Sequence, residues 1–406
     1  MEKYNLIDLF AGCGGLLDGF MQSEKYLPIA SVEWDFAAAK TLANRLSNKW
    51  GITQPSEKVL TFDIQRVDEL FNGYSDEHYG HSKGLNNLIN DLKIDVIVGG
   101  PPCQSYSVAG RVSDKKKMKD DYRNYLFEHY MKIVEKLQPK VFLLENVPGM
   151  LSAMPDGTPI IDLIKRDINE KGYDIIDDVR KFAIVDSSDY GVPQNRKRVI
   201  LIGINKNLFP GNDIQKTISK FYLDILPRYK SSTKLTVYDA ISDLPKCVPL
   251  YTNKKPSHTK PITDITWHYS RFHSLRDVKI FQMLAADIES GINKYSDSKE
   301  LIAIYNEATG AKTKIHKYHV LKKDLPSTTI LAHLYKDGLR FIHYDPTQAR
   351  SITVREAARL QSFDDDFDFL GSQTDAFKMI GNAVPPKLAL KLALALNDLL
   401  KEIEGG

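Results

Sequence analysis

The chain of 406 residues has few cysteines, and they are widely spaced. There are three, Cys13, Cys103 and Cys247, and no two of them form a CxxC pair. Three thiols cannot build a disulfide framework, and without a CxxC pair a cysteine-rich zinc site is excluded. We therefore predict no metal ligand set and a reducing compartment, which for this chain means the cytoplasm.

The sequence also lacks a long hydrophobic run, an internal repeat and an extended low-complexity tract. Its start, MEKYNLIDLF, carries an acidic residue early and no long apolar core, so no secretory signal peptide is predicted. The most apolar late segment, KLALKLALALNDLL, is shorter than a membrane span and is interrupted by lysines. We interpret it as a packed C-terminal helix, and we expect no membrane association.

The overall charge is nearly balanced, at +3, but it is distributed unevenly. Residues 206–350 carry 23 lysines and arginines against 14 acidic residues, a net charge of +9, so the remainder of the chain is net −6. A basic block beside an acidic one suggests that the middle of the chain binds a polyanion. A lysine-rich surface without a partner is the alternative that charge alone leaves open.

The first half of the chain alternates apolar runs with amphipathic segments, as α/β proteins do. Runs typical of buried strands are YNLIDLF, PIASVEW, IDVIVGG, KVFLLENV, DDVRKFAIV and RVILIGI. Helical patterns lie between them, as in FAAAKTLANRLSNKW, YLFEHYMKIVEKLQ and PIIDLIKRDINEKG. This order predicts a doubly wound α/β fold with a mostly parallel sheet.

The alternation stops after Ile204, where Lys, Tyr, His, Pro and Ser become more frequent. We predict that residues 1–205 form the α/β domain and that residues 378–406 complete it. Residues 206–350 would form a second, smaller and irregular domain. Residues 351–377 would lead the chain back to the first domain.

The first predicted strand leads into a glycine-rich turn, DLFAGCGGL, and then a helix. Glycines there let the backbone approach a ligand, although the full GxGxxG dinucleotide pattern is missing. Glu33 ends the second strand, where an acid can bind ribose hydroxyls, and Trp34 offers a flat face to adenine. Asp63 could accept a hydrogen bond from the adenine amino group. Together these residues predict an adenosine site without a pyrophosphate cradle, which favours S-adenosylmethionine over NAD.

A second motif, GGPPCQSYS, holds Cys103 behind two prolines at the end of a predicted strand. A nucleophilic cysteine needs a partner that stabilises the charge it creates. Glu145, in LLENV, ends the adjacent strand and could protonate a ring nitrogen. In PQNRKRV, Arg196 and Arg198 alternate at i and i+2, which places both on one face of a strand. Taken alone, each residue also has a structural explanation: Cys103 as a small buried residue in a loop, Glu145 as an acid at a strand end, and the arginines as basic residues on the surface.

These motifs, in this order, resemble the DNA cytosine-5 methyltransferases of bacterial restriction-modification systems. The resemblance rests on DLFAGCGGL, GGPPCQSYS, ENV, QNRKR, REAARLQSF and GNAVPP, and it spans residues 4 to 400 except the variable block near 206–325. It implies a Rossmann-like catalytic domain, with 206–350 as a target-recognition domain. It further implies transfer of a methyl group from S-adenosylmethionine to C5 of a flipped cytosine in a short duplex site, with S-adenosylhomocysteine as product.

Carried over by matching position, the resemblance implies that Cys103 attacks carbon 6 of the base and that Glu145 acts at N3 and the amino group. Arg198 would hold the base O2, and Arg196 would support the catalytic loop and phosphates. The segment SVAGRVSDKKKMKDDYRN resembles the mobile lid of this family. Positions that match those around the methyl donor are Phe10, Ala11, Gly12, Gly14, Gly15, Leu16, Glu33, Trp34, Asp63, Ile64, Pro101, Leu126, Asn382 and Val384.

Other functions were weighed against this one. A minority branch of the family acts on tRNA and carries a Cys-Phe-Thr tripeptide, which is missing here. A catalytically silent DNA-binding regulator would not need Cys103, Glu145 and Arg198, and the glycine spacing disfavours an NAD oxidoreductase. The expected partner is double-stranded DNA, and the expected state is a monomer. A cognate restriction endonuclease is compatible with the family. HYSRFHSLRD and KIHKYHVLKK are the segments expected to contact DNA.

Overall fold

The computed structural model describes residues 3–102, 126–154, 157–211, 213–295, 297–336 and 338–405. The chain divides into two compact units. The first comprises residues 1–190, 196–232 and 383–406, and the second comprises 191–195 and 233–382. The composition change after Ile204 therefore lies 28 residues before the point where the chain leaves the first unit at 232/233.

The first unit is built on a sheet whose described strands number eight. Its order is β3-β2-β1-β6-β7-β10-β8, with β9 also pairing with β10. The neighbours from β3 to β7 are parallel, and β10 is antiparallel to β7, β8 and β9. This confirms the predicted α/β fold with a mostly parallel sheet. The strands are β1 (Tyr4–Leu9), β2 (Tyr26–Glu33), β3 (Val59–Thr61), β6 (Val96–Gly99), β7 (Val141–Asn146), β8 (Tyr173–Asp174), β9 (Ile184–Asp186) and β10 (Lys197–Asn205), and a separate hairpin has β4 (Tyr74–Asp76) and β5 (Gly80–Ser82).

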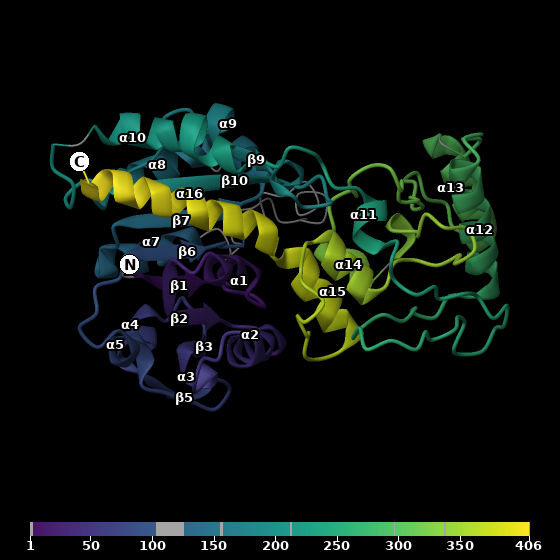
Figure 1. The fold of residues 1–406 in the computed structure, drawn as a ribbon, viewed down its shortest axis with the longest axis horizontal. Coiled ribbons are helices and arrows are strands. Elements are labelled where there is room, and N and C mark those ends of the chain that lie inside the picture. Colours follow the sequence, from purple (N-terminus) through teal and green to yellow (C-terminus); the bar gives the residue numbers. More distant parts are fainter. Residues whose placement is uncertain are drawn as a thin grey trace. The chain divides into compact units, whose positions relative to one another are not determined.

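Helices connect the parallel strands, as such a sheet requires. Asp35 caps α2 by accepting a hydrogen bond from the Ala38 N–H at 3.0 Å. The C-terminal helix, yellow in Figure 1, packs against α1 and so returns to this unit. The helices are α1 (Gly15–Gln22), α2 (Phe36–Asn48), α3 (Pro55–Lys58), α4 (Val67–Asn72), α5 (Gly84–Ile89), α7 (Leu126–Leu137), α8 (Ile160–Glu170), α9 (Val179–Phe182), α10 (Ile214–Lys220) and α16 (Pro386–Gly405), with single turns at Pro148–Ser152, Ser187–Tyr190, Phe221–Ile225 and Leu226–Tyr229.

One predicted strand is mostly helix. In DDVRKFAIV, only Ile184 and Val185 belong to β9, whereas Val179–Phe182 forms α9. The side chain of Asp178 accepts a hydrogen bond from the Lys181 N–H at 3.0 Å. An aspartate that caps the first turn in this way favours a helix over an extended chain.

The C-terminal segment is strongly apolar because most of its side chains are buried in the protein core. The segment Gln373–Gly405 is long and apolar enough to cross a membrane by length and composition alone, contrary to the expectation drawn from KLALKLALALNDLL. However, 67% of its most apolar window is buried in the structure. Leu388, Leu392, Leu396 and Leu399 of α16 are fully buried, which is typical of a core helix.

The second unit contains helices and loops around a small apolar core. Phe281 and Leu284 of α12 pack there with Tyr318, Val320 and Ile342. Its helices are α11 (Val237–Ile241), α12 (Leu275–Glu289), α13 (Ser298–Thr309), α14 (Val354–Leu360) and α15 (Gln373–Asn382), with single turns at Ala332–Tyr335 and Gly338–Arg340.

A buried ion pair also organises the second unit. The two terminal guanidinium nitrogens of Arg350, Nη1 and Nη2, contact the carboxylate of Glu356 at 2.7 Å, and both side chains are at most 1% exposed. Glu356 in turn accepts a hydrogen bond from the Thr353 N–H, completing the cap of α14. His343 lies 3.6 Å from the same carboxylate. Removing one partner of such a pair would leave an uncompensated buried charge.

We expect the second unit to lose stability when the pH falls below neutrality. Burial, reinforced by the nearby positive charge of Arg350, lowers the pKa of His258 and of His343 to about 4, although Glu356 partly opposes this at His343. Between pH 6.5 and about 4, the unfolded chain binds protons that the folded chain excludes, so the free energy of unfolding decreases as pH falls. Urea denaturation at several pH values measures this. A stability that stays constant between pH 7 and 4.5 would contradict it.

Candidate active site

The carboxyl ends of the parallel strands carry most of the predicted site residues. The strand order reverses between β1 and β6, and at that switch point Leu9 pairs with Gly99. In an open α/β sheet, ligands bind in the crevice outside the carboxyl ends of the strands at this point. The glycine-rich turn after β1 and the Gly-Pro-Pro step after β6 therefore flank the same crevice.

The turn after β1 has an unusual backbone. Phe10, Gly12 and Gly14 all have positive φ angles, of 57°, 55° and 93°. A positive φ at a bulky aromatic residue is strained, so the fold itself must hold Phe10 in place. A Cβ at Gly14 would lie 2.5 Å from Leu42 Cδ1, whereas one at Gly12 would meet no atom within 4 Å. Gly14 is thus required for packing, while Gly12 borders open space.

Glu33 holds this turn in place from the end of β2. Its Oε2 accepts a hydrogen bond from the Gly12 N–H at 2.7 Å, and its Oε1 accepts from the N–H groups of Trp34 and Asp35 at 2.9 and 2.8 Å. Burial raises the pKa of Glu33, and these hydrogen bonds oppose the rise. The carboxylate therefore shapes the loop, and the acceptor capacity that Oε2 retains can still serve a ligand hydroxyl.

The other residues predicted for the adenosine line the same edge. Trp34 is 58% exposed, which leaves its indole available to a ligand. Asp63 is half-buried, and its Oδ1 accepts a hydrogen bond from the Gln65 N–H at 3.0 Å. Ile64 and Leu126 are buried apolar side chains. Polar acceptors, an exposed indole and apolar side chains together fit an adenosine.

Sequence reasoning did not single out Asp8, which lies in β1 two residues before Phe10. It is 1% exposed, and neither carboxylate oxygen has a hydrogen-bond partner among the described residues. Burial, with a smaller contribution from Glu33, raises the pKa of Asp8 well above its ordinary value. The available signal was an acidic residue inside the otherwise apolar run YNLIDLF.

The other side of the crevice places Glu145 close to the backbone of Gly100. A Cβ at Gly100 would lie 3.0 Å from Glu145 Oε2, so a side chain there would press on the carboxylate. Asn146 links the two strand ends because its Nδ2 donates to the Pro101 carbonyl at 3.2 Å. Cys103 lies outside the described residues, as does the whole of the lysine-rich segment 107–124 that follows it.

Glu145 and Arg198 are brought together by the pairing of β7 with β10. Ile200 of β10 lies opposite Glu145, so the start of β10 meets the end of β7. Arg198 Nε lies 2.8 Å from Glu145 Oε1, and the two side chains are 11% and 12% exposed. A carboxyl group and a guanidinium in contact, both partly accessible, can present a group that exchanges protons and a hydrogen-bond donor to one ligand.

Arg196 occupies a different environment. It is 2% exposed, and its Nη2 donates to the Ala383 carbonyl at 3.1 Å. Burial lowers its pKa, an effect that Arg198 reinforces and Glu145 opposes. Ala383 lies between Asn382 and Val384, two residues predicted to contact the methyl donor. Asn382 belongs to the second unit, whereas Val384 is buried in the first.

The two other cysteines are unsuited to nucleophilic chemistry. Cys13 and Cys247 are at most 1% exposed, and burial raises the pKa of both thiols. A thiolate is the reactive form, so a buried thiol with a raised pKa is inert. Within the described ranges, no group of three or more His, Cys, Asp or Glu side chains could hold a metal ion.

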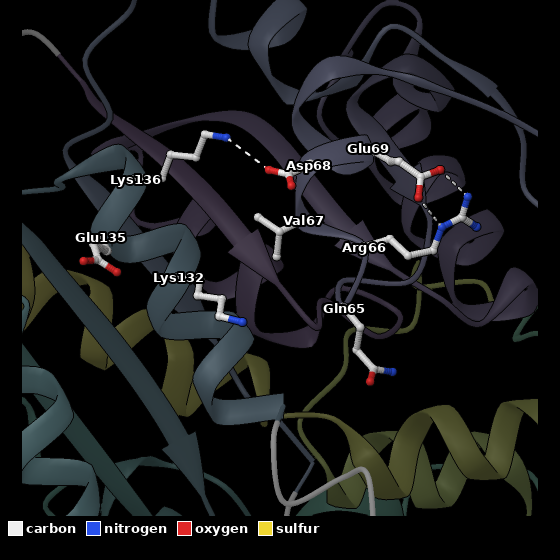
Figure 2. A pocket seen from close by; sticks show the side chains of 8 residues that line it. All are labelled: Gln65, Arg66, Val67, Asp68, Glu69, Lys132, Glu135 and Lys136. Carbon is white, nitrogen blue, oxygen red and sulfur yellow. Dashed lines mark hydrogen bonds and ion pairs between the residues drawn. The ribbon is translucent and has the colours of Figure 1, made fainter.

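A polar hollow of about 490 Å³ is lined by residues of α4 and α7 and by the turn before α4 (Figure 2). Four of its six charged side chains pair with one another: Arg66 with Glu69, and Lys136 with Asp68 at 3.9 Å. None of the predicted site residues lines it. The hollow is a charged surface next to Asp63 and not part of the candidate site.

Comparisons with known proteins agree on one family. The model of the C-5 cytosine-specific DNA methylases matches residues 4–398. The type II methyltransferase M.Bpa9945I of Bacillus paralicheniformis is 32% identical, covering 97% of this chain and 99% of that protein. M.AgeI of Thalassovita gelatinovora, also a type II methyltransferase, is 30% identical, and the match covers 95% of this chain and 97% of that protein.

Solved structures show the same fold. A structure described as a DNA modification methyltransferase encoded within an E. coli prophage matches with a TM-score of 0.64 and 27% identity, over 98% of this chain and 100% of that one. The Dnmt2 methyltransferase of S. pombe matches with a TM-score of 0.54 at 12% identity, and the match covers 98% of this chain and 99% of that one. At that identity the likeness concerns the fold alone.

Proposed function

Because the chain belongs to the family of C-5 cytosine-specific DNA methylases and is a DNA cytosine-5 methyltransferase, we propose that it modifies one cytosine within a specific short duplex sequence. The observation that carries this proposal is the Glu145–Arg198 pair at the end of β7, next to the Gly-Pro-Pro step that leads to Cys103. A cytosine that stays stacked in the DNA duplex cannot reach Glu145 and Arg198. The target cytosine is therefore flipped out of the duplex.

S-adenosylmethionine, when bound, supplies the methyl group as a reactive sulfonium. The residues present fit its adenosine half, with Glu33 for the ribose, Asp63 for the adenine amino group, and Trp34 and Ile64 for the ring. Gly12 leaves space where a side chain would meet the ligand. The remaining positions proposed around the donor are Phe10, Ala11, Gly14, Gly15, Leu16, Pro101, Leu126, Asn382 and Val384.

Cys103 and Glu145 make the base reactive. C5 of cytosine is too weakly nucleophilic to accept a methyl group unaided. The Cys103 thiolate adds to C6 while Glu145 donates a proton to N3, and the ring becomes an enamine that is nucleophilic at C5. C5 then takes the methyl group that the bound donor would supply, with cleavage of the donor's sulfur–carbon bond. Loss of the C5 proton to water, return of the N3 proton to Glu145 and departure of Cys103 as a thiolate would restore the aromatic ring.

The two arginines have separate roles. Arg198, in contact with Glu145, donates hydrogen bonds to the base O2 and fixes the ring against the acid. The bond from Arg196 to the Ala383 carbonyl supports a positioning role, because it fixes the backbone next to Val384. Because the Arg196 side chain is buried, we propose that its main role is to position this backbone and not to contact phosphates.

The basic block at 206–350 supplies the phosphate contacts to DNA, and most of it, residues 233–350, belongs to the second unit. We place the enzyme in the bacterial cytoplasm, associated with the nucleoid, as a monomer. Its relatives are type II methyltransferases, so it would protect sites that a cognate restriction endonuclease cleaves.

Expression in a bacterium without cytosine methylation should introduce 5-methylcytosine at one short sequence. Bisulfite sequencing of the genomic DNA identifies the site and the modified base, and the Glu145→Gln variant is the control. Methylation of N4, of adenine, or of tRNA alone would contradict the proposal.

A Gly12→Ala variant should bind S-adenosylmethionine at least about tenfold more weakly while staying folded. The side chain of the introduced alanine has space in the free protein. The main cost to the stability of the fold is therefore about 1–2 kcal/mol, because alanine must adopt the left-handed backbone conformation. Calorimetric titration measures binding. Gly14→Ala is the contrasting variant, because its Cβ would strike Leu42 and destabilise the fold. Wild-type affinity in Gly12→Ala would exclude a ligand at this turn.

A further inference from the structure

We infer that the loop Leu250–Thr266 of the second unit is a DNA-contacting surface, with Lys254 and Lys255 on phosphates and Ile262 against a base edge. This inference rests on the proposed function and assigns the contact to a segment different from the two histidine-containing ones suggested by the sequence. Three observations support it. The two histidine-containing segments use several of their side chains inside the unit, hydrogen bonds fix the base of the loop, and the loop exposes lysines and the apolar side chain of Ile262.

The segment HYSRFHSLRD uses its histidines and first arginine inside the unit. His268 is 2% exposed and bonds the Pro245 carbonyl at 2.7 Å, and His273 is 7% exposed and bonds Ser351 at 3.2 Å. Arg271 donates to the Leu334 carbonyl at 3.0 Å and lies 4.6 Å from the ring of Phe377. Side chains committed in this way cannot turn toward DNA without breaking the fold.

The segment KIHKYHVLKK is similarly committed at its centre. Tyr318, Val320 and Leu321 are at most 9% exposed, and the first two belong to the core cluster with Phe281. Its exposed lysines lie at the two ends of the segment, separated by these buried residues. It offers lysines at two separate ends and one exposed apolar side chain, Ile315, which is 56% exposed against 103% for Ile262.

The loop Leu250–Thr266 combines a fixed base with exposed parts. The Leu250 N–H donates to the Ser257 carbonyl and the Thr259 N–H to the Val248 carbonyl, at 2.9 and 2.8 Å. His258 is 3% exposed and contacts the Gln348 carbonyl at 3.0 Å. Buried anchors at the middle of the loop leave an exposed stretch on each side, at 251–256 and 259–266.

The exposed stretches are basic and carry an exposed apolar side chain. Lys254, Lys255 and Lys260 are exposed, and Asp264 is the sole acidic residue between 250 and 266. This charge complements a polyanion. Ile262 is 103% exposed, so it contributes nothing to the packing of the unit. Lysines beside an isolated apolar side chain fit the chemistry of duplex DNA, where phosphates flank thymine methyl groups in the major groove.

Full exposure of Ile262 makes a clean test possible. An Ile262→Ala variant cannot lose packing inside the protein, so we expect an unchanged melting temperature and at least about a fivefold fall in kcat/KM on a duplex carrying the wild-type site. Ile292→Ala, at a residue 74% exposed in the same unit, is the matched control and should stay near wild type. Equal activity of the two variants, at any level, would overturn the role of Ile262.

The lysines are tested by the salt dependence of DNA binding. Removing two phosphate contacts with Lys254→Ala/Lys255→Ala should reduce the slope of log Kd against log salt by about 2, measured by anisotropy on a fluorescein-labelled duplex. Lys279→Ala/Lys299→Ala removes the same charge from exposed positions on α12 and α13, and its slope should change by less. Equal slopes for the two double variants would overturn the phosphate role. A wild-type protein that neither binds nor methylates duplex DNA would instead contradict the proposed function.

Discussion

A Cys103→Ala variant is expected to methylate DNA at least about 10⁴-fold more slowly than the wild type, while its affinity for S-adenosylmethionine stays within about twofold. The proposed thiolate bonds only to the base, whereas the donor is proposed to bind at the turn after β1 and Glu33. Without addition at C6, C5 remains a poor nucleophile. Cys13 and Cys247 are buried thiols with raised pKa values and cannot substitute.

The measurement is incorporation of a labelled methyl group into duplex DNA, together with calorimetric titration of the donor. Cys247→Ala is the matched control, because it removes a buried thiol from the second unit and should retain methyl transfer. Turnover by Cys103→Ala within tenfold of wild type would exclude Cys103 as the nucleophile.

A Glu145→Gln variant is expected to lose about 10²- to 10⁴-fold in kcat, the usual contribution of a positioned general acid. The amide keeps the shape of the side chain and can still accept a hydrogen bond from Arg198, so the fold and DNA binding should persist. It cannot transfer a proton to N3, and attack at C6 would then build charge on the ring.

A cytosine with fluorine at C5 separates this role from that of Cys103. Fluorine cannot leave as a proton does, so the wild-type enzyme should remain bonded to the DNA as a band that survives denaturant. The band should require S-adenosylmethionine, vanish in Cys103→Ala and be strongly reduced in Glu145→Gln. Glu135→Gln, in the polar hollow outside the site, is the control and should form the adduct. An adduct that forms equally well in Glu145→Gln would mean that another group is the acid.

Much of the candidate site was predictable because its residues follow directly after strands. Parallel strands end at the same edge of a sheet, so the sequence alone predicts that Glu33, Glu145 and the Gly-Pro-Pro step lie near one another. The contact between Glu145 and Arg198 is harder to predict. It depends on β10 lying antiparallel to β7, and local patterns do not reveal which strands pair.

The sequence by itself determined the family and the α/β fold class, and it proposed the groups that can do chemistry, although Val179–Phe182 is a helix where a strand was predicted. These properties depend on local periodicity and on short motifs. Only the tertiary structure decided how three of the polar residues are used. Arg196 donates to a carbonyl 187 residues away, Asp8 has no hydrogen-bond partner among the described residues, and His268 is enclosed within its unit. Burial and long-range partners are set by how distant segments pack, and a residue's type and neighbours in sequence carry no record of that.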